Sequence, residues 1–384
     1  MPNKKPLIFI IAGEVSGDAL GARIMRQMAN SANFVGIGGA AMCSCGLRSV
    51  FPLADLSVMG VIEVLAHART LKRRIHETVQ AIIDSQPDIV LTIDSPGFAR
   101  SVIKKLRRLS AGQELIANGL RFHHIVAPQV WAWRPGRAKK YAKIFDKLYA
   151  FFDFEVPYFT KYGLDTVAVG HPIAENIMDP VAVGSPAPRD DKIITLVLGS
   201  RMNEVKKLMP LFKSVVSTIS SCGYRNYKFA IPTVETTAEY VRHAIQDWPI
   251  KPELVDAASR YDLYRNTYVA VVASGTVSAE LAMLHVPAVV VYKMNKITTL
   301  IGHLLIRVRW VSLVNILLNR GIYPEFLGEK ATAENVVGAI DEIILPANRS
   351  RMCAELAAAD DMWVRPDGVA SKLIANDVLR HVMR

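Results

Sequence analysis

Short apolar runs that alternate with segments of helical pattern are the feature that most constrains this chain. In the first part of the sequence the runs cover residues 7–11, 34–37, 89–93, 122–126, 148–152 and 167–169. Further runs follow at residues 193–198, 228–231, 268–272 and 288–291, separated by helical segments such as 204–221. Strands separated by whole helices need crossover connections, which favour parallel sheets. The sequence therefore predicts an α/β protein with two Rossmann-like halves.

The stretch DPVAVGSPAPRDD, residues 179–191, is the best linker in the chain because it carries three prolines among turn-forming residues. A length of 384 residues also exceeds one ordinary core of roughly 150 residues. We predict an N-terminal domain over residues 1–180, a second domain over 181–348, and a helical tail over 349–384 that packs back on the first. Two domains imply a cleft between them.

Charge and cysteine content narrow the class of protein. The net charge of +11 comes from clustered basic residues, which suit nucleic acid, an anionic membrane face or phosphorylated substrates. We expect no nucleic-acid binding, because no recognised binding module is visible. The four cysteines lack zinc-like spacing, and charged residues interrupt the apolar segment 300–318, so we expect a cytoplasmic protein with no membrane span.

Polar residues that directly follow two strands of the second half suit phosphate. GSRMNE follows the run 193–198 and ASGTVSAE follows the run 268–272, so each places backbone N–H groups and a hydroxyl where a helix begins. A carboxylate one turn into the second helix can accept both hydroxyls of a ribose. Ordinary helix capping is the alternative for either motif alone. The predicted nucleotide-binding residues are Gly199, Ser200, Arg201, Glu204, Ser274, Gly275, Thr276 and Glu280.

The first half opens with LIFIIAGEVSGDALGA, in which Gly13, Gly17 and Gly21 recur at every fourth position. This spacing matches neither a dinucleotide fingerprint nor a Walker loop. The second run leads into Gly38 and Gly39 with no acidic residue for an adenine ribose. NAD binding is therefore disfavoured, and we expect no cofactor.

Three other positions of the first half can carry chemistry. Asp94, in DSPGF, ends the third run, where it acts as a general base toward a hydroxyl nucleophile or simply forms a turn. In APQVWAWRPGR, Trp131 and Trp133 pack on sugar rings or acyl chains, or belong to the core, and Arg134 and Arg137 suit an anionic group. His171, in VGHPI, lines the cleft or buttresses the hinge.

The stretch LSVMGVIEVLAHARTLKRRI, residues 56–75, joins an apolar helical stripe to basic residues. Most such stripes are core. Here the extra apolar residues favour an interfacial helix on anionic lipid. The predicted membrane contacts are Met59, Val61, Ile62, Leu65, Arg69, Lys72 and Arg73.

The chain resembles the lipid A disaccharide synthase family in nine ordered motifs: AGEVSGDALGA, GIGG, MGVIEVL, DSPGF, PQVWAWRPGR, VGHP, GSRMNE, ASGTVSAELAM and VSLVNILLNR. This resemblance implies a GT-B type fold, in which two Rossmann-like domains face each other and the second holds most of the nucleotide. It also implies an inverting transfer. The 6-hydroxyl of 2,3-diacylglucosamine 1-phosphate attacks the anomeric carbon of UDP-2,3-diacylglucosamine, and UDP leaves.

The same resemblance implies roles for individual residues. Asp94 is the base, Arg201 with the 274–276 motif stabilises the leaving diphosphate, Glu280 holds the ribose and Asn315 completes the pocket. We expect no metal, because no D-x-D triplet occurs. We expect peripheral attachment to the cytoplasmic face of the inner membrane, and a homodimer is left open. The glycine loop would let the backbone approach the acceptor, whose site comprises Gly13, Glu14, Ser16, Gly17, Asp18, Gln129, Trp131, Trp133, Arg134 and His171.

The sequence departs from the family pattern at a few positions. Gly97 stands where many relatives carry a second acidic residue, while Leu198 and Val314 replace prolines. We expect altered loop stiffness with function retained. The alternative is another UDP-sugar enzyme of the same fold, such as the N-acetylglucosaminyltransferase of peptidoglycan assembly or a UDP-sugar epimerase.

Overall fold

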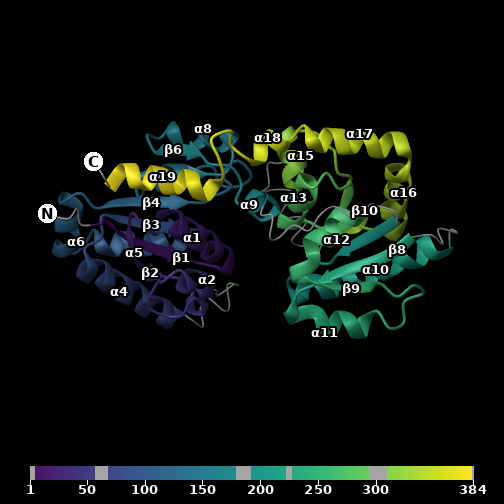
Figure 1. Ribbon diagram of the computed structural model, residues 1–384, viewed down its shortest axis with the longest axis horizontal. Helices are drawn as coiled ribbons and strands as arrows, with labels where there is room; N and C mark the ends of the chain where they lie inside the picture. The colour runs from purple at the N-terminus through teal and green to yellow at the C-terminus, as the bar shows by residue number, and fades with distance from the viewer. Residues whose placement is uncertain (1–4, 57–67, 179–191, 222–226, 294–308, 383–384) are drawn as a thin grey trace. The chain divides into compact units, whose positions relative to one another are not determined.

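The computed structural model describes residues 5–56, 68–178, 192–221, 227–293 and 309–382 (Figure 1). The backbone separates into two compact units, which we call unit 1 (Met1–Pro172 with Val364–Arg384) and unit 2 (Ile173–Trp363). Each unit holds one six-stranded sheet, and the paired strands run parallel in both. The predicted α/β class with two parallel sheets is therefore confirmed.

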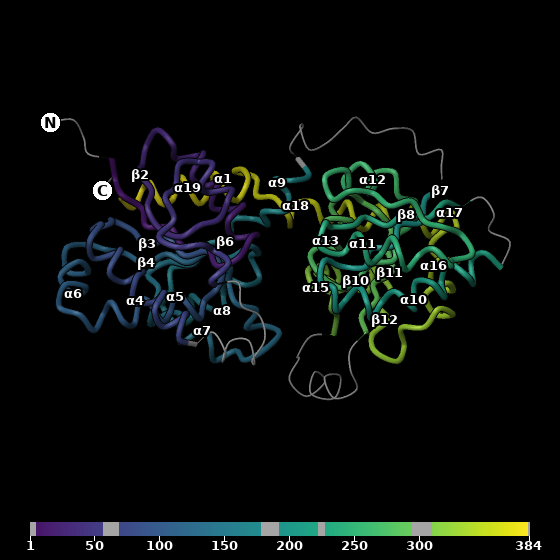
Figure 2. The backbone as a smooth tube through the Cα atoms, turned by 90° about the horizontal axis from the view of Figure 1, so that it is seen from below, coloured from purple at the N-terminus to yellow at the C-terminus, as the bar shows by residue number. Residues whose placement is uncertain are grey.

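The sheet of unit 1 has the strand order β2-β1-β3-β4-β5-β6. Helices α4 and α5 pack on one face and α1 and α19 on the other, as Figure 2 also shows. The strands are β1 (Leu7–Ala12), β2 (Asn33–Ile37), β3 (Ile89–Ile93), β4 (Arg121–Ile125), β5 (Lys147–Ala150) and β6 (Asp165–Ala168). The helices are α1 (Val15–Met28), α2 (Ala40–Ser44), α4 (Ala68–Ser85), α5 (Pro96–Leu106), α6 (Ser110–Ala117), α7 (Arg137–Ala142), α8 (Pro157–Thr160) and α19 (Ala370–Val382).

The sheet of unit 2 has the strand order β12-β11-β10-β7-β8-β9. Its core lies between the sheet and the apolar faces of α10 and α16. The strands are β7 (Lys192–Val197), β8 (Tyr227–Thr233), β9 (Glu253–Asp256), β10 (Thr267–Ala273), β11 (Ala288–Tyr292) and β12 (Glu325–Leu327). The helices are α9 (Ile173–Met178), α10 (Met202–Ser221), α11 (Glu235–Ala244), α12 (Arg260–Asn266), α13 (Thr276–Met283), α15 (Leu313–Leu318), α16 (Ala333–Ile344), α17 (Pro346–Ala357) and α18 (Asp360–Trp363).

The unit boundaries differ from the predicted ones. The first unit ends at Pro172 rather than at residue 180, because α9 packs against α13 of unit 2. The tail divides: α17 and α18 belong to unit 2, whereas α19 packs on α1 of unit 1. A buried ion pair holds α19 there, since Lys147 Nζ lies 3.0 Å from an Asp377 carboxylate oxygen. Tyr149 donates a hydrogen bond of 2.8 Å to the same carboxylate.

Ten of the strands coincide with predicted apolar runs to within a few residues, but β9 and β12 were not predicted. Both lie at the edges of the second sheet and are short, so they carry too few buried apolar residues to show an alternation. No helix among the described residues is long and apolar enough to cross a membrane.

Candidate functional site

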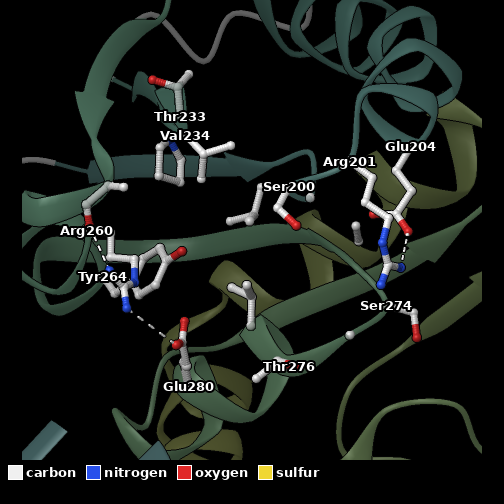
Figure 3. Close-up of a pocket in the computed structure, with 17 residues that line it drawn as sticks. Ser200, Arg201, Glu204, Thr233, Val234, Arg260, Tyr264, Ser274, Thr276 and Glu280 are labelled. Carbon is white, nitrogen blue, oxygen red and sulfur yellow. Dashed lines mark hydrogen bonds and ion pairs between the residues drawn. The ribbon is translucent and has the colours of Figure 1, made fainter. Parts of the chain in front are cut away.

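A pocket of about 300 Å³ opens at the carboxyl ends of β7, β8 and β10, which are neighbours in the sheet of unit 2. Ligands of open parallel sheets bind at this edge. Both predicted phosphate motifs line this pocket, and Figure 3 shows Ser200, Arg201 and Ser274 around it. Every residue predicted for the nucleotide except Asn315 lines this pocket.

The first motif owes its shape to Gly199. Its φ of +93° is a backbone conformation that residues with a side chain rarely adopt. A Cβ at this position would lie 2.8 Å from Glu204 Oε2. The Glu204 carboxylate accepts a hydrogen bond of 3.1 Å from Arg201 Nη1, and the Arg201 side chain as a whole stays 61% exposed. The N-terminus of α10 and that of α13 both lie at the pocket. Their positive dipole ends favour an anionic group.

The opposite end of the pocket holds the buried carboxylate of Glu280. Tyr261 donates a hydrogen bond of 2.9 Å to Glu280 Oε1, and Arg260 Nη2 lies 3.9 Å from the same oxygen. Arg260 also donates a bond of 3.0 Å to the Tyr261 hydroxyl. Burial raises the pKa of Glu280, and the charge of Arg260 and the bond from Tyr261 oppose that rise. The arrangement presents a carboxylate acceptor to the pocket (Figure 3).

The sequence did not predict three residues at this end of the pocket: Arg260, Tyr261 and Tyr264. They belong to α12, which follows the unpredicted strand β9, so no strand end pointed to them. The Arg-Tyr pair at residues 260–261, which precedes the predicted strand at 268–272, was the only sequence signal for these residues, and it is a weak one.

Asn315 does not line the pocket. The side chain is fully buried, and its amide oxygen accepts bonds of 2.9 Å from the N–H groups of Ile322 and Tyr323. Its amide nitrogen donates to Tyr323 O and to Glu325 Oε1, both at 2.8 Å. We therefore withdraw Asn315 from the nucleotide set, because these bonds give it a structural role in holding the loop before β12.

Strained backbone marks the corresponding edge of unit 1. Seven non-glycine residues in the described chain have positive φ. Four of them lie after β3 and β4: Asp94 (55°), Ser95 (43°), Val126 (83°) and Arg134 (51°). Such strain costs roughly 1–3 kcal/mol per residue and gathers at functional sites. The two strands are adjacent, and the Asp94 N–H donates a bond of 3.1 Å to Ile125 O.

The three glycines of the opening loop pack closely against residues of other segments of unit 1. A Cβ on Gly13 would lie 1.9 Å from Ser95 Oγ, and one on Gly17 would lie 3.3 Å from Ile93 Cγ2. A Cβ on Gly21 would lie 2.6 Å from Met42 Sδ and 3.1 Å from Ile93 Cδ1. The glycines therefore allow α1 to approach β3 and the Asp94–Ser95 turn closely. This packing is a structural reason for the spacing of the glycines, and their predicted approach to the acceptor stays a prediction.

Asp18 also has a structural role. It is 4% exposed, and its carboxylate accepts backbone bonds from Gly39 (2.7 Å), Ala41 (2.9 Å) and Met42 (3.1 Å). The side chain thereby ties α1 to the start of α2. We withdraw it from the acceptor set. Of its neighbours in that set, Ser16 is exposed and Glu14 is half-buried.

The two tryptophans of WAWRPGR have different surroundings. Trp131 Nε1 donates a bond of 3.2 Å to the buried Glu155, which also accepts from the N–H groups of Phe151 and Phe152. Burial raises the pKa of Glu155 to about 7, although these three hydrogen bonds lower it. The indole of Trp131 is thus held by the buried Glu155, whereas the guanidinium of Arg134 lies over the ring of Trp133.

His171 and Gln129 are two further residues of unit 1 that were predicted to contact the acceptor. The ring of His171 stacks on Phe152 with centroids 5.7 Å apart and contacts Phe151 at 4.8 Å. Burial lowers the pKa of His171 to about 4, so the imidazole is neutral near pH 7. Gln129 is exposed.

The predicted membrane segment is described only in part. Met59, Val61, Ile62 and Leu65 lie outside the described residues. Arg69, Lys72 and Arg73 are exposed near the start of α4, and Arg73 pairs with Glu77 at 3.6 Å. Across the described part of the chain, no three His, Cys, Asp or Glu side chains are grouped so that they could hold a metal ion.

Solved structures place this fold in a known class. The UDP-GlcNAc 2-epimerase from Neisseria meningitidis bound to UDP-GlcNAc aligns with a TM-score of 0.62 at 12% identity, over 97% of this chain and 100% of that one. The glycotransferase of kitacinnamycin aligns with a TM-score of 0.63 at 12% identity, over 99% and 100%. With the two parallel six-stranded sheets, these likenesses define a two-unit protein of the GT-B fold.

The family follows from sequence. A family model described as lipid-A-disaccharide synthetase matches residues 8–359. Lipid-A-disaccharide synthase from Rhodospirillum centenum is 40% identical over 352 residues, covering 89% of this chain and 86% of that protein. The one from Granulibacter bethesdensis is 38% identical, covering 88% and 86%. The chain belongs to the lipid-A-disaccharide synthase family, and it is a glycosyltransferase of lipid A biosynthesis.

Proposed function

We propose that this enzyme joins UDP-2,3-diacylglucosamine to 2,3-diacylglucosamine 1-phosphate, yielding the tetraacyl disaccharide 1-phosphate and UDP. The observation that carries the proposal is the pocket of unit 2, where two helix N-termini, an exposed arginine and a buried carboxylate line one cavity. These groups match a nucleoside diphosphate, with cationic groups for the phosphates and an acceptor for the ribose. Family membership directs the choice toward a UDP-sugar and a lipid acceptor.

The donor half of the reaction is assigned to unit 2. Ser200, Ser274 and Thr276 supply hydroxyls at the helix starts, and Arg201 supplies an exposed positive charge. Negative charge grows on the β-phosphate as the bond to the anomeric carbon breaks. Donors that are already oriented toward this charge lower the barrier without a reorganisation cost.

The acceptor half is assigned to Asp94. Its Oδ1 accepts a bond of 2.8 Å from the Ser95 N–H, which orients the carboxylate at the strained turn. We assign Asp94 the role of the general base, which takes the proton from the 6-hydroxyl of the acceptor. The acceptor oxygen then bonds to the anomeric carbon, the bond from that carbon to the UDP oxygen breaks, and the configuration inverts. UDP carries away the electron pair.

Attachment to the membrane is part of the proposal. Both proposed sugar substrates carry acyl chains, so the enzyme must meet them at a lipid surface. The exposed basic residues at the start of α4 suit the anionic cytoplasmic face of the inner membrane. A homodimer remains a compatible arrangement.

Release of UDP tests the function directly. The purified enzyme is incubated in detergent, without added metal, with the UDP-sugar in the presence and absence of the acceptor. We expect UDP release only with both substrates, and Asp94→Asn to lower kcat by at least about 100-fold with UDP affinity kept. The matched control is Asp84→Asn, which removes an exposed carboxylate from the end of α4. Acceptor-independent epimerisation would contradict the proposal and favour the alternative enzyme class.

A further inference from the structure

Two guanidinium groups lie over the ring of Trp133 in unit 1. Arg134 Cζ lies 4.3 Å from a ring centroid of the indole, and Arg137 Cζ lies 5.2 Å from it. Arg134 is exposed, whereas Arg137 is half-buried and donates a hydrogen bond of 3.2 Å to Trp133 O. Two other half-buried arginines of this unit have acidic partners, since Arg74 pairs with Asp55 and Arg365 with Asp153. No carboxylate among the described residues lies within ion-pair distance of the two at Trp133. Two positive charges thus stand together without a counter-charge from the described chain.

Buried polar atoms beside these charges also lack a partner among the described residues. Trp133 Nε1, Arg137 Nε and the Tyr141 hydroxyl are shielded from solvent and make no hydrogen bond there. Tyr141 as a whole is 8% exposed, and it lies one turn after Arg137 on α7. Native structures rarely leave several neighbouring donors unpaired, because each costs free energy. A bound group with acceptor oxygens would relieve that cost.

The cluster lies close to Asp94. It follows β4, the immediate neighbour of β3, at the same strand edge. The charges of both Arg137 and Asp94 act on the Tyr141 hydroxyl, the first lowering its pKa and the second raising it, while burial raises it most. The backbone strain at Val126 and Arg134 lies on the segment that joins β4 to the cluster.

We propose that Arg134 and Arg137, stacked on Trp133, form an anion-binding subsite that holds the phosphate of the acceptor. This inference rests on the proposed function. A guanidinium binds phosphate through paired N–H groups, so two of them neutralise a dianion. The two positive charges also offset the repulsion between this phosphate and the carboxylate of Asp94. With the phosphate held in this way, the far hydroxyl of the same sugar is left for the base.

The test compares two acceptors in detergent: 2,3-diacylglucosamine 1-phosphate and 2,3-diacylglucosamine without the phosphate. The variants are Arg134→Gln, Arg137→Gln and, as a matched control, Lys140→Gln, which removes an exposed charge from the same helix. Each arginine variant should raise the KM for the phosphorylated acceptor roughly 10- to 100-fold. The KM for the unphosphorylated acceptor, the kcat and UDP affinity should stay near wild type.

A second measurement needs no turnover. Calorimetric binding of the phosphorylated acceptor, without donor, should weaken in the arginine variants and not in Lys140→Gln. Equal losses with both acceptors, or an equal loss in Lys140→Gln, would overturn the subsite. Weaker binding to phosphatidylglycerol vesicles with unchanged KM values would overturn it in favour of a lipid headgroup. Failure of the wild type to release UDP with either acceptor would instead refute the proposed function.

Discussion

The hydroxyl groups of the nucleotide ribose should be recognised by Glu280, and a deoxynucleotide measures that contact. A hydrogen bond to a charged carboxylate contributes roughly 1.5–3 kcal/mol. Glu280 is buried and accepts from Tyr261 at 2.9 Å, so little of this is lost to solvent. Wild-type enzyme should therefore bind UDP about 10- to 100-fold more tightly than 2′-deoxy-UDP.

Glu280→Gln keeps the shape of the side chain and removes its charge. A neutral acceptor contributes roughly half as much, so the preference for UDP should fall to about 3- to 10-fold. Isothermal titration of both nucleotides gives the ratio of their dissociation constants. Arg201→Gln is the control, because it removes a charge from the phosphate end of the same pocket and should weaken both nucleotides alike. If Glu280→Gln also weakened both alike, its carboxylate would not contact the ribose.

Tyr261→Phe tests whether the carboxylate needs to be positioned. The change removes one hydroxyl, which bonds both Glu280 and Arg260, and keeps the ring. The UDP preference should fall to a value between those of wild type and Glu280→Gln, with diphosphate affinity unchanged. A ratio equal to that of wild type would show that the tyrosine has no part in orienting the carboxylate.

Three further changes test the structural assignments of unit 1. Asp18→Ala leaves three backbone N–H groups without their acceptor and should cost about 2–4 kcal/mol in urea unfolding, whereas the exposed Asp84→Ala should cost less than about 0.5 kcal/mol. Gly13→Ala drives its Cβ into Ser95, so acceptor turnover should fall at least about tenfold while calorimetric UDP binding is kept. Burial raises the pKa of Glu155 from 4.5 to about 7. The native state therefore holds a proton that the unfolded chain releases, and stability falls as pH rises through this interval. The free energy of unfolding of Glu155→Gln lacks this loss, so relative to wild type it should rise by up to about 1.4 kcal/mol per pH unit between the two pKa values. Urea unfolding of both proteins at pH values between about 5 and 8 measures this difference.

The strand pattern was readable from sequence because burial on both faces of a parallel sheet needs near-continuous apolar runs. The runs at residues 7–11 and 89–93, for example, fall within β1 and β3. Edge strands bury less, so β9 escaped prediction, and with it the Arg260–Tyr261 pair.

The sequence by itself determined the α/β class, the two parallel sheets and the phosphate motifs at residues 199–201 and 274–276. These depend on local periodicity and on the polar residues that directly follow a strand. Only the tertiary structure decided that Asp18 and Asn315 satisfy backbone groups, that the spaced glycines pack against Ser95, Ile93 and Met42, and that Arg134 and Arg137 lie over the Trp133 ring. Each of these depends on which backbone segment packs beside a residue, and that partner lies far away in the chain.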